Sequence, residues 1–219
     1  MRPFRYGSVC SGIEAATMAW HTLPGWQPAW FSEINPFASA VLAHQYPEVP
    51  NLGDMTTLPA RILQREVEAP DLLVGGTPCQ AFSLAGLRKG LTDPRGQLTR
   101  TFVEILDAID AVRAVPALAL WENVPGVLSD RTNAFGNLLA ALVGEDRELE
   151  PPGGRWTHAG CVLGPKRRAA WRVLDAQYFG VAQQRRRVFL AVGAPAGGID
   201  PVEVLLVEPG VRRHSPPSR

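Results

Sequence analysis

The chain alternates short apolar runs with helix-like segments, and this alternation limits the folds open to it more than any other feature. Strand-like runs occupy residues 4–9, 27–33, 70–76 and 116–123. Segments with helical periodicity or helix-end signals lie at residues 12–23, 35–46, 58–67 and 98–114. Because strand–helix–strand units form right-handed crossovers, the alternation predicts parallel strands in one sheet with helices on both faces. We therefore expect an α/β fold with a doubly wound, mostly parallel sheet.

Boundary residues and later runs add detail to this prediction. Asn35 and Pro36 have the residue types of a helix N-cap and a first helical position. Apolar runs at residues 171–177 and 187–193 predict two late strands, of which we expect the last to be antiparallel. Residues 144–160 are polar and predict a surface excursion, and the final RRHSPPSR is typical of a tail.

Composition is that of one compact domain without a membrane span. A chain of 219 residues suits a single core, which grows to about 250 residues before it splits. No run approaches the roughly 18 apolar residues of a membrane helix, and the N-terminus lacks a secretion signal, so we expect a cytoplasmic protein. The three cysteines are scattered and odd in number, which predicts free thiols, and no CxxC or HxxxH spacing indicates a metal site.

Charge is divided unevenly along the chain. Residues 151–219 hold 11 Lys or Arg and 4 Asp or Glu, a net charge of +7. Since the whole chain carries +1, residues 1–150 carry −6. The basic clusters at residues 166–168, 185–187 and 212–213 suit a polyanion such as nucleic acid, and they suit a solvated surface equally well.

Polar residues follow the first strands at the edge where ligands bind in parallel sheets. Gly12 follows the first strand, and Glu33 lies 21 residues later, near the spacing at which a carboxylate meets ribose hydroxyls in dinucleotide folds. Asp54, in NLGDMT, is a third candidate and would accept a hydrogen bond from an adenine amino group. The alternative is purely structural, with Gly12 as a turn residue and the two acids as helix caps.

Cys79 lies in the tight turn GGTPCQAFS, directly after the strand at 70–76. A thiol at the carboxyl end of a strand lies over the ligand crevice, and it becomes a nucleophile when N–H donors or cations favour its thiolate. WENVPG ends the next strand in the same way and offers Glu122 as a general acid or hydrogen-bond anchor. The alternative for a cysteine is a small buried side chain that only packs in the core, and we keep this interpretation for Cys10 and Cys161.

Six stretches, in this order, resemble the motifs of the DNA cytosine-5 methyltransferases. They are VCSGIEAA (9–16), FSEINPFA (31–38), GDMT (53–56), GGTPCQAFSLAG (75–86), WENVPG (121–126) and FGVAQQRRRVF (179–189). RGQL (95–98) occupies the place of a short cofactor contact in that family. The resemblance spans residues 6 to about 193.

This resemblance implies a Rossmann-like fold of the class I S-adenosylmethionine-dependent methyltransferases, with S-adenosylmethionine as methyl donor and S-adenosylhomocysteine as product. The residues that would bind the donor are Cys10, Ser11, Gly12, Ile13, Glu33, Ile34, Asp54, Pro78 and Leu98. The acceptor would be a cytosine flipped out of duplex DNA.

The resemblance also assigns catalytic roles. The Cys79 thiolate would add to cytosine C6, Glu122 would hold N3 and the amino group, and Arg185 and Arg187 would brace the base and nearby backbone. The residues that would contact the substrate are Gln80, Ser83, Asn123 and Gln183.

The chain departs from the family in two places. Glu14 and Ala15 stand where the family usually has more glycine, and the family continues into a DNA-reading region and two final motifs beyond the matching part. We therefore expect residues 1–195 to form the catalytic domain and residues 196–219 to be a tail at the start of a missing or separate target-recognition region or subunit. Two alternatives stay open: an RNA cytosine-5 methyltransferase, and a non-catalytic donor- or DNA-binding module that needs a C-terminal complement. The biological role is equally open between restriction–modification, evasion of host defence and gene control.

Overall fold

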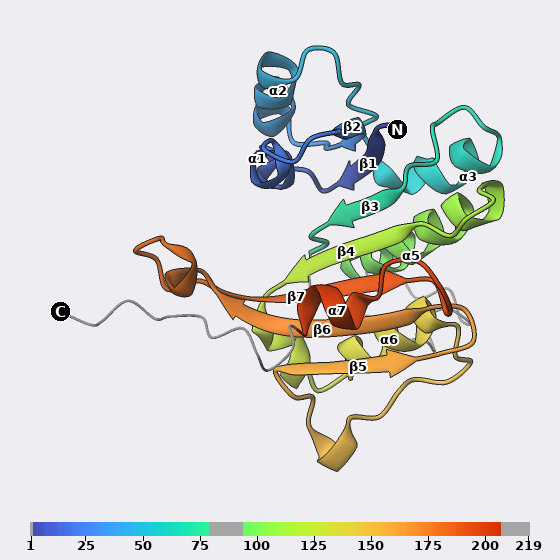
Figure 1. Ribbon diagram of the computed structural model, residues 1–219, viewed down its shortest axis with the longest axis vertical. Coiled ribbons are helices and arrows are strands. Elements are labelled where there is room, and N and C mark those ends of the chain that lie inside the picture. Colours follow the sequence, from blue (N-terminus) through green and yellow to red (C-terminus); the bar gives the residue numbers. More distant parts are fainter. Residues whose placement is uncertain (1, 79–93, 207–219) are drawn as a thin grey trace.

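The structure is a computed structural model that describes residues 2–78 and 94–206 (Figure 1). Its strands form one sheet in the order β2-β1-β3-β4-β7-β6-β5. Their bounds are β1 Phe4–Val9, β2 Trp26–Ser32, β3 Leu72–Gly75, β4 Leu118–Asn123, β5 Ala159–Leu163, β6 Arg168–Asp175 and β7 Arg186–Gly193.

The sheet has a parallel half and an antiparallel half. Strands β1 to β4 pair in parallel, as the alternation predicts. Strand β7 is antiparallel to β4, β6 to β7 and β5 to β6, so the antiparallel part includes more than the last strand that we expected. The short connection between β6 and β7 requires this direction, because parallel neighbours need a long crossover. The fold class is confirmed.

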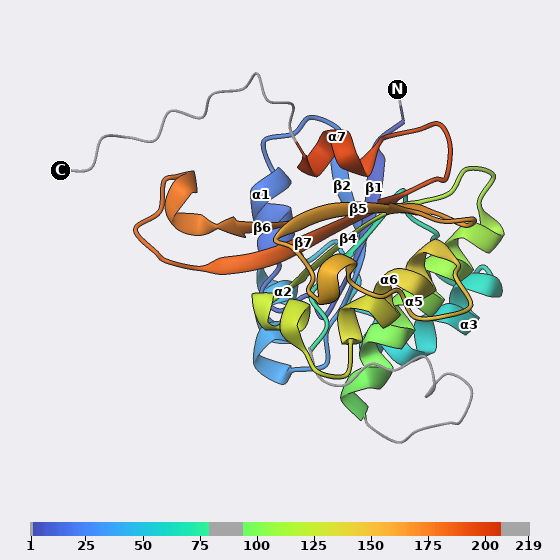
Figure 2. The same cartoon turned by 90° about the horizontal axis from the view of Figure 1, so that it is seen from below.

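The helices divide unequally between the two faces of the sheet. Helices α3 (Leu58–Leu63), α5 (Pro94–Val112) and α6 (Ala134–Val143) lie together on one face, where the main hydrophobic core forms (Figure 2). On the other face α1 (Ala15–Trp20) packs against β3 and β4, and α7 (Pro201–Leu205) packs against β6 and β7. Helix α2 (Pro36–Gln45) begins at Asn35, whose side chain caps it as predicted.

Two predicted helices are shorter than expected because residues at positive φ limit them. Helix α1 begins at Ala15 instead of residue 12, since Gly12 and Glu14 have φ of 57° and 66°. Helix α3 ends at Leu63 instead of residue 67, and Arg65 beyond it has φ of 62°. A helix requires right-handed residues throughout, so these positions exclude it.

Three elements were not predicted. Helix α6 is buried on nearly all sides and therefore lacks the polar face of an amphipathic helix. Strand β5 begins inside the expected surface excursion and lies at the sheet edge. Helix α7 lies in the expected tail, where Asp200 caps it and pairs with Arg168 at 2.9 Å. The expected boundary between a catalytic domain and a tail at residue 195 stays a prediction. None of the described helices combines the length and apolar character of a membrane span.

Candidate active site

The ends of β1 and β2 hold Glu33 beside the turn that precedes α1. The Gly12 backbone N–H donates to Glu33 Oε2 at 2.8 Å, and the Asn35 N–H donates to Oε1 at 2.8 Å. Glycine tolerates its φ of 57° without strain. Each carboxylate oxygen keeps a further lone pair, so Glu33 is oriented and still able to accept from ligand hydroxyls. The structure thus brings together the pair whose spacing suggested a cofactor site.

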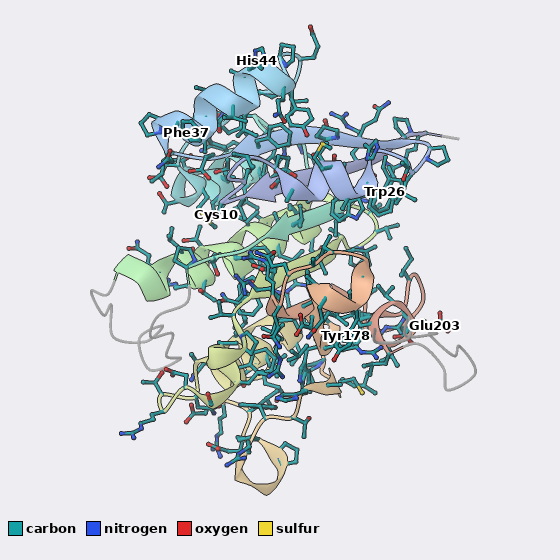
Figure 3. All side chains as sticks on the ribbon, turned by 90° about the vertical axis from the view of Figure 1, so that its left-hand side faces the viewer. Cys10, Trp26, Phe37, His44, Tyr178 and Glu203 are labelled. Carbon is teal, nitrogen blue, oxygen red and sulfur yellow. The ribbon has the colours of Figure 1, made fainter. Side chains whose placement is uncertain are left out.

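Ser11 and Cys10 shape the same turn. Ser11 Oγ donates to the Ser8 carbonyl at 3.0 Å and accepts from the Ser32 N–H at 3.2 Å, which joins the ends of β1 and β2. Cys10 Sγ lies 3.6 Å from the Met55 sulfur. Burial, and secondarily the charge of Glu33, raises the pKa of Cys10 to about 11, so this thiol stays neutral. In Figure 3, Cys10 lies at the opposite end of these strands from Trp26.

Apolar side chains lie exposed around this edge. Ile34 is 74% exposed and Ile13 58%, and Phe37, in the first turn of α2, is exposed as well. Asp54 Oδ1 accepts from the Thr56 N–H at 2.9 Å, so Asp54 caps the short helix η1 (Met55–Thr57), as the structural alternative had it. Its exposed carboxylate keeps acceptor capacity toward a ligand.

Glu122, at the end of β4, lies against the predicted arginines. Arg187 Nε is 2.8 Å from Glu122 Oε1, and Arg185 Nη2 is 4.0 Å from the same oxygen. The antiparallel register of β4 and β7 sets Phe189 opposite Glu122, which places Arg187 just beyond the end of β4. A Cβ at Gly76 would come within 3.0 Å of Glu122 Oε2, so glycine lets the carboxylate lie against the turn after β3.

The segment that leads to Cys79 is held by buried hydrogen bonds. The Thr77 hydroxyl accepts from Trp121 Nε1 at 2.9 Å and lies 3.0 Å from the Thr99 hydroxyl. Asn123 Nδ2 donates to the Thr77 carbonyl at 2.8 Å, and Asn123 Oδ1 accepts from the next N–H, of Val124. The buried Asn123 therefore has a structural role here, and its predicted substrate contact stays a prediction.

The remaining predicted residues divide into three groups. Cys79, Gln80 and Ser83 lie outside the described residues. Pro78 and Gln183 are exposed, and Gln183 lies in the connection between β6 and β7, which projects beyond the sheet (Figure 1). Leu98, in α5, is partly buried against the main core. Its predicted cofactor contact stays a prediction.

A cavity of about 660 Å³ opens on the α1 face of the sheet, between the turn before α1 and the arginines of β7. This volume is typical of a small-molecule site. Its walls combine Cys10 and Ser11 with side chains that sequence reasoning missed: Glu14, Trp20, Leu174, Phe179 and Phe189. Of these, only Glu14 was noticeable in the sequence, because it stands where the resembling family usually has glycine. The apolar walls suit the carbon skeleton of a nucleoside donor, and the carboxylates suit its hydroxyl and cationic groups.

The sequence matches the model of the family described as C-5 cytosine-specific DNA methylase over residues 4–194. The chain belongs to this family. Both the fold and the family are those of S-adenosylmethionine-dependent methyltransferases.

Curated relatives extend the match beyond the family model. The chain is 52% identical over 244 residues to the DNA N-6-adenine-methyltransferase of Escherichia phage P1, covering 100% of this chain and 32% of that relative. It is 30% identical to the Type II methyltransferase M.AquIA of Picosynechococcus, covering 84% of this chain and 69% of that relative. It is 34% identical to the Type II methyltransferase M.NgoBV of Neisseria gonorrhoeae, covering 73% of this chain and 33% of that relative. The chain thus spans about a third of two of these relatives.

Solved structures share the fold of this chain. The crystal structure of S. pombe Dnmt2 methyltransferase superposes with a TM-score of 0.60 at 16% identity, covering 90% of this chain and 52% of that one. At this identity the likeness concerns the fold alone.

Proposed function

We propose that this chain carries the catalytic part of a DNA (cytosine-5) methyltransferase. The observation that supports it best is the position of Glu122. Its carboxylate lies at the end of β4, 2.8 Å from Arg187 and against Gly76, at the turn that leads to Cys79. An acid and two guanidinium groups thus lie at one edge of the sheet, and the acid lies against Gly76, three residues before Cys79 in the chain. We assign the Cys79 thiol to nucleophilic attack on a pyrimidine.

Each group has a chemical task in this proposal. Cytosine C5 is a weak nucleophile, and the Cys79 thiolate activates it by forming a bond to C6. Glu122 holds N3 and the amino group and supplies or shares a proton there, and the arginines keep its carboxylate oriented. S-adenosylmethionine supplies the methyl group to C5. Loss of the C5 proton then expels the Cys79 thiolate and releases the methylated base.

The name of the phage P1 relative raises a second candidate, methylation of adenine N6. That relative is about three times as long as the match, so its printed activity describes a protein of which this chain covers 32%. Attack by an adenine amino group needs no thiol adduct. The placement of Cys79 after a turn that buried hydrogen bonds hold therefore favours cytosine C5.

The decisive experiment identifies the methylated base. The chain is incubated with labelled S-adenosylmethionine and duplex DNA, RNA or no nucleic acid, and the digested product is resolved by mass spectrometry. We expect 5-methylcytosine in DNA. N6-methyladenine would overturn the proposal in favour of the second candidate, label in RNA alone would indicate an RNA methyltransferase, and donor binding without transfer would indicate a non-catalytic module.

One variant and one modified substrate test the role of Cys79. Cys79→Ser should abolish transfer and leave donor binding intact. DNA with 5-fluorocytosine at a target site should trap the wild-type chain covalently through Cys79, because no C5 proton is available to leave. A trapped peptide that contains Cys161 instead would contradict the assignment of the nucleophile.

A further inference from the structure

Glu14 is a buried acid without a cationic partner in residues 2–78 and 94–206. Its side chain is 1% exposed, and Oε1 accepts hydrogen bonds from the Thr17 N–H at 3.2 Å and the Thr17 hydroxyl at 3.1 Å. The Thr17 hydroxyl lies in turn 2.8 Å from the Tyr6 hydroxyl. These partners are neutral, and none of the ion pairs within the described residues includes Glu14.

This arrangement is costly for the free protein. Buried charges are normally paired, because hydrogen bonds alone replace only part of the lost hydration. The residue also has φ of 66°, a left-handed conformation that is unfavourable for a side chain other than glycine or asparagine. A neutral residue would meet the same hydrogen-bond donors at the start of α1. Burial raises the pKa of Glu14, against the opposing hydrogen bonds from Ser8 and Thr17, which agrees with a charge that lacks compensation.

The cavity explains where a partner for this charge would come from. Two carboxylates line it, Glu14 at the α1 side and Glu122 at the β4 side. The charge of Glu122 is compensated by Arg187 and Arg185. Among the described lining residues Glu14 is thus the acid whose charge is unopposed, and a cation bound in the cavity would balance it.

We propose that Glu14 is a specificity-determining residue that favours the positively charged methyl donor over the neutral product. This inference rests on the proposed function and on the donor binding in the cavity, whose walls suit it. S-adenosylmethionine carries a sulfonium, and methyl transfer converts it to an uncharged thioether. The Glu14 carboxylate would attract the sulfonium and not the thioether. Methyl transfer would therefore weaken this attraction and favour release of the product.

Binding measurements on the intact chain test the proposal without recourse to turnover. Three ligands are compared by calorimetry at low ionic strength: S-adenosylmethionine, S-adenosylhomocysteine, and an analogue in which an amine replaces the methylsulfonium. Glu14→Gln keeps the shape and one acceptor oxygen. We expect it to weaken both cationic ligands at least about tenfold, which is well below the full strength of a close charge pair at an effective permittivity of about 20 and allows for the cost of desolvation, and to change the affinity for S-adenosylhomocysteine less than twofold.

Two further variants keep the result interpretable. Glu33→Gln is the matched control, because the family resemblance assigns Glu33 to the ribose, which all three ligands share, so this variant should weaken all three alike. Glu14→Gly suits the left-handed conformation and removes the charge by a different structural change, so it should repeat the loss of selectivity even if the glutamine variant folds poorly. Equal weakening of all three ligands by the Glu14 variants, or no change, would overturn this inference alone. A wild-type chain that binds none of them would overturn the proposed function as well.

Discussion

The Thr77 hydroxyl is one of the buried groups that hold the turn before Cys79. It accepts from Trp121 Nε1 and lies within hydrogen-bond distance of Thr99, and all three side chains are buried. Thr77→Val keeps the volume and leaves the indole N–H without an acceptor, which should lower the free energy of unfolding by about 1–3 kcal/mol. Urea denaturation measures this loss. Thr77→Ser retains the hydroxyl and should lose much less, and equal losses would show that the hydroxyl is not the stabilising group.

The two cysteines described by the structure should differ sharply in reactivity. Cys161 is exposed on β5, whereas Cys10 is partly buried with a pKa raised to about 11. Because the thiolate is the reactive form, Cys10 should stay protonated at pH 8 and react only as the pH approaches 11. In a Cys79→Ser background, iodoacetamide at pH 8 should label Cys161 first, as peptide mass spectrometry can follow. Equally fast labelling of Cys10 would contradict the buried position.

At the scale of elements, α6 depends on a glycine that contacts another segment. A Cβ at Gly136 would lie 2.1 Å from the Leu149 carbonyl and 2.5 Å from Asn133 Oδ1. Gly136→Ala should therefore force the 144–149 segment away from α6 and cost about 1–3 kcal/mol of stability. Gly126→Ala is the matched control, since its Cβ meets nothing within 4 Å, and its effect should stay within about 0.5 kcal/mol. Thermal melting of the two variants measures both losses of stability, and coincident melting curves would contradict the close contact at Gly136.

Elements were predictable where the signal is local. The parallel strands follow from apolar runs, and the start of α2 follows from Asn35 and Pro36, whose conformations the neighbouring residues determine. The start of α1 was not predictable, because Cys10 and Glu14 take left-handed conformations that few non-glycine residues adopt. Helix α6 was not predicted, because a helix that is buried on almost every side lacks the periodic polar residues of an amphipathic helix.

At the scale of the whole molecule, the sequence predicted which residues at the strand ends lie together, and it did not predict the walls of the cavity. Gly12 with Glu33, and Glu122 with Arg187, come together because the carboxyl ends of parallel strands share one edge of a sheet. The wall residues Trp20 and Phe189 come from distant segments, and only tertiary packing brings them to one cavity. The structural hydrogen bond of Asn123 was not predictable for the same reason, since its partner Thr77 belongs to a neighbouring strand end.

Asp71 connects distant parts of the chain and gives the molecule a predictable response to acid. It accepts hydrogen bonds from Arg2 Nη2 at 2.6 Å, the Arg5 N–H at 2.9 Å and Arg113 Nη2 at 2.7 Å, so it joins the N-terminus and β1 to the segment after α5. Burial alone would raise the pKa of Asp71. The hydrogen bonds from Arg5, Arg2 and Arg113 outweigh burial and hold the pKa below its ordinary value.

Asp71→Asn should consequently cost about 1–3 kcal/mol at pH 7, because it leaves the largely buried Arg113 guanidinium without its anion, whereas Arg2 is 70% exposed and loses little. A lowered folded-state pKa contributes stability above the unfolded pKa, and that contribution is lost as the pH falls through the folded value. The difference in unfolding free energy between wild type and Asp71→Asn should therefore be constant near neutrality and shrink toward pH 3, as urea denaturation at each pH would measure. Asp146→Asn, at an exposed position, should differ little from wild type throughout. A wild-type advantage that persists undiminished at pH 3 would mean that packing, and not the charge of Asp71, holds these segments together.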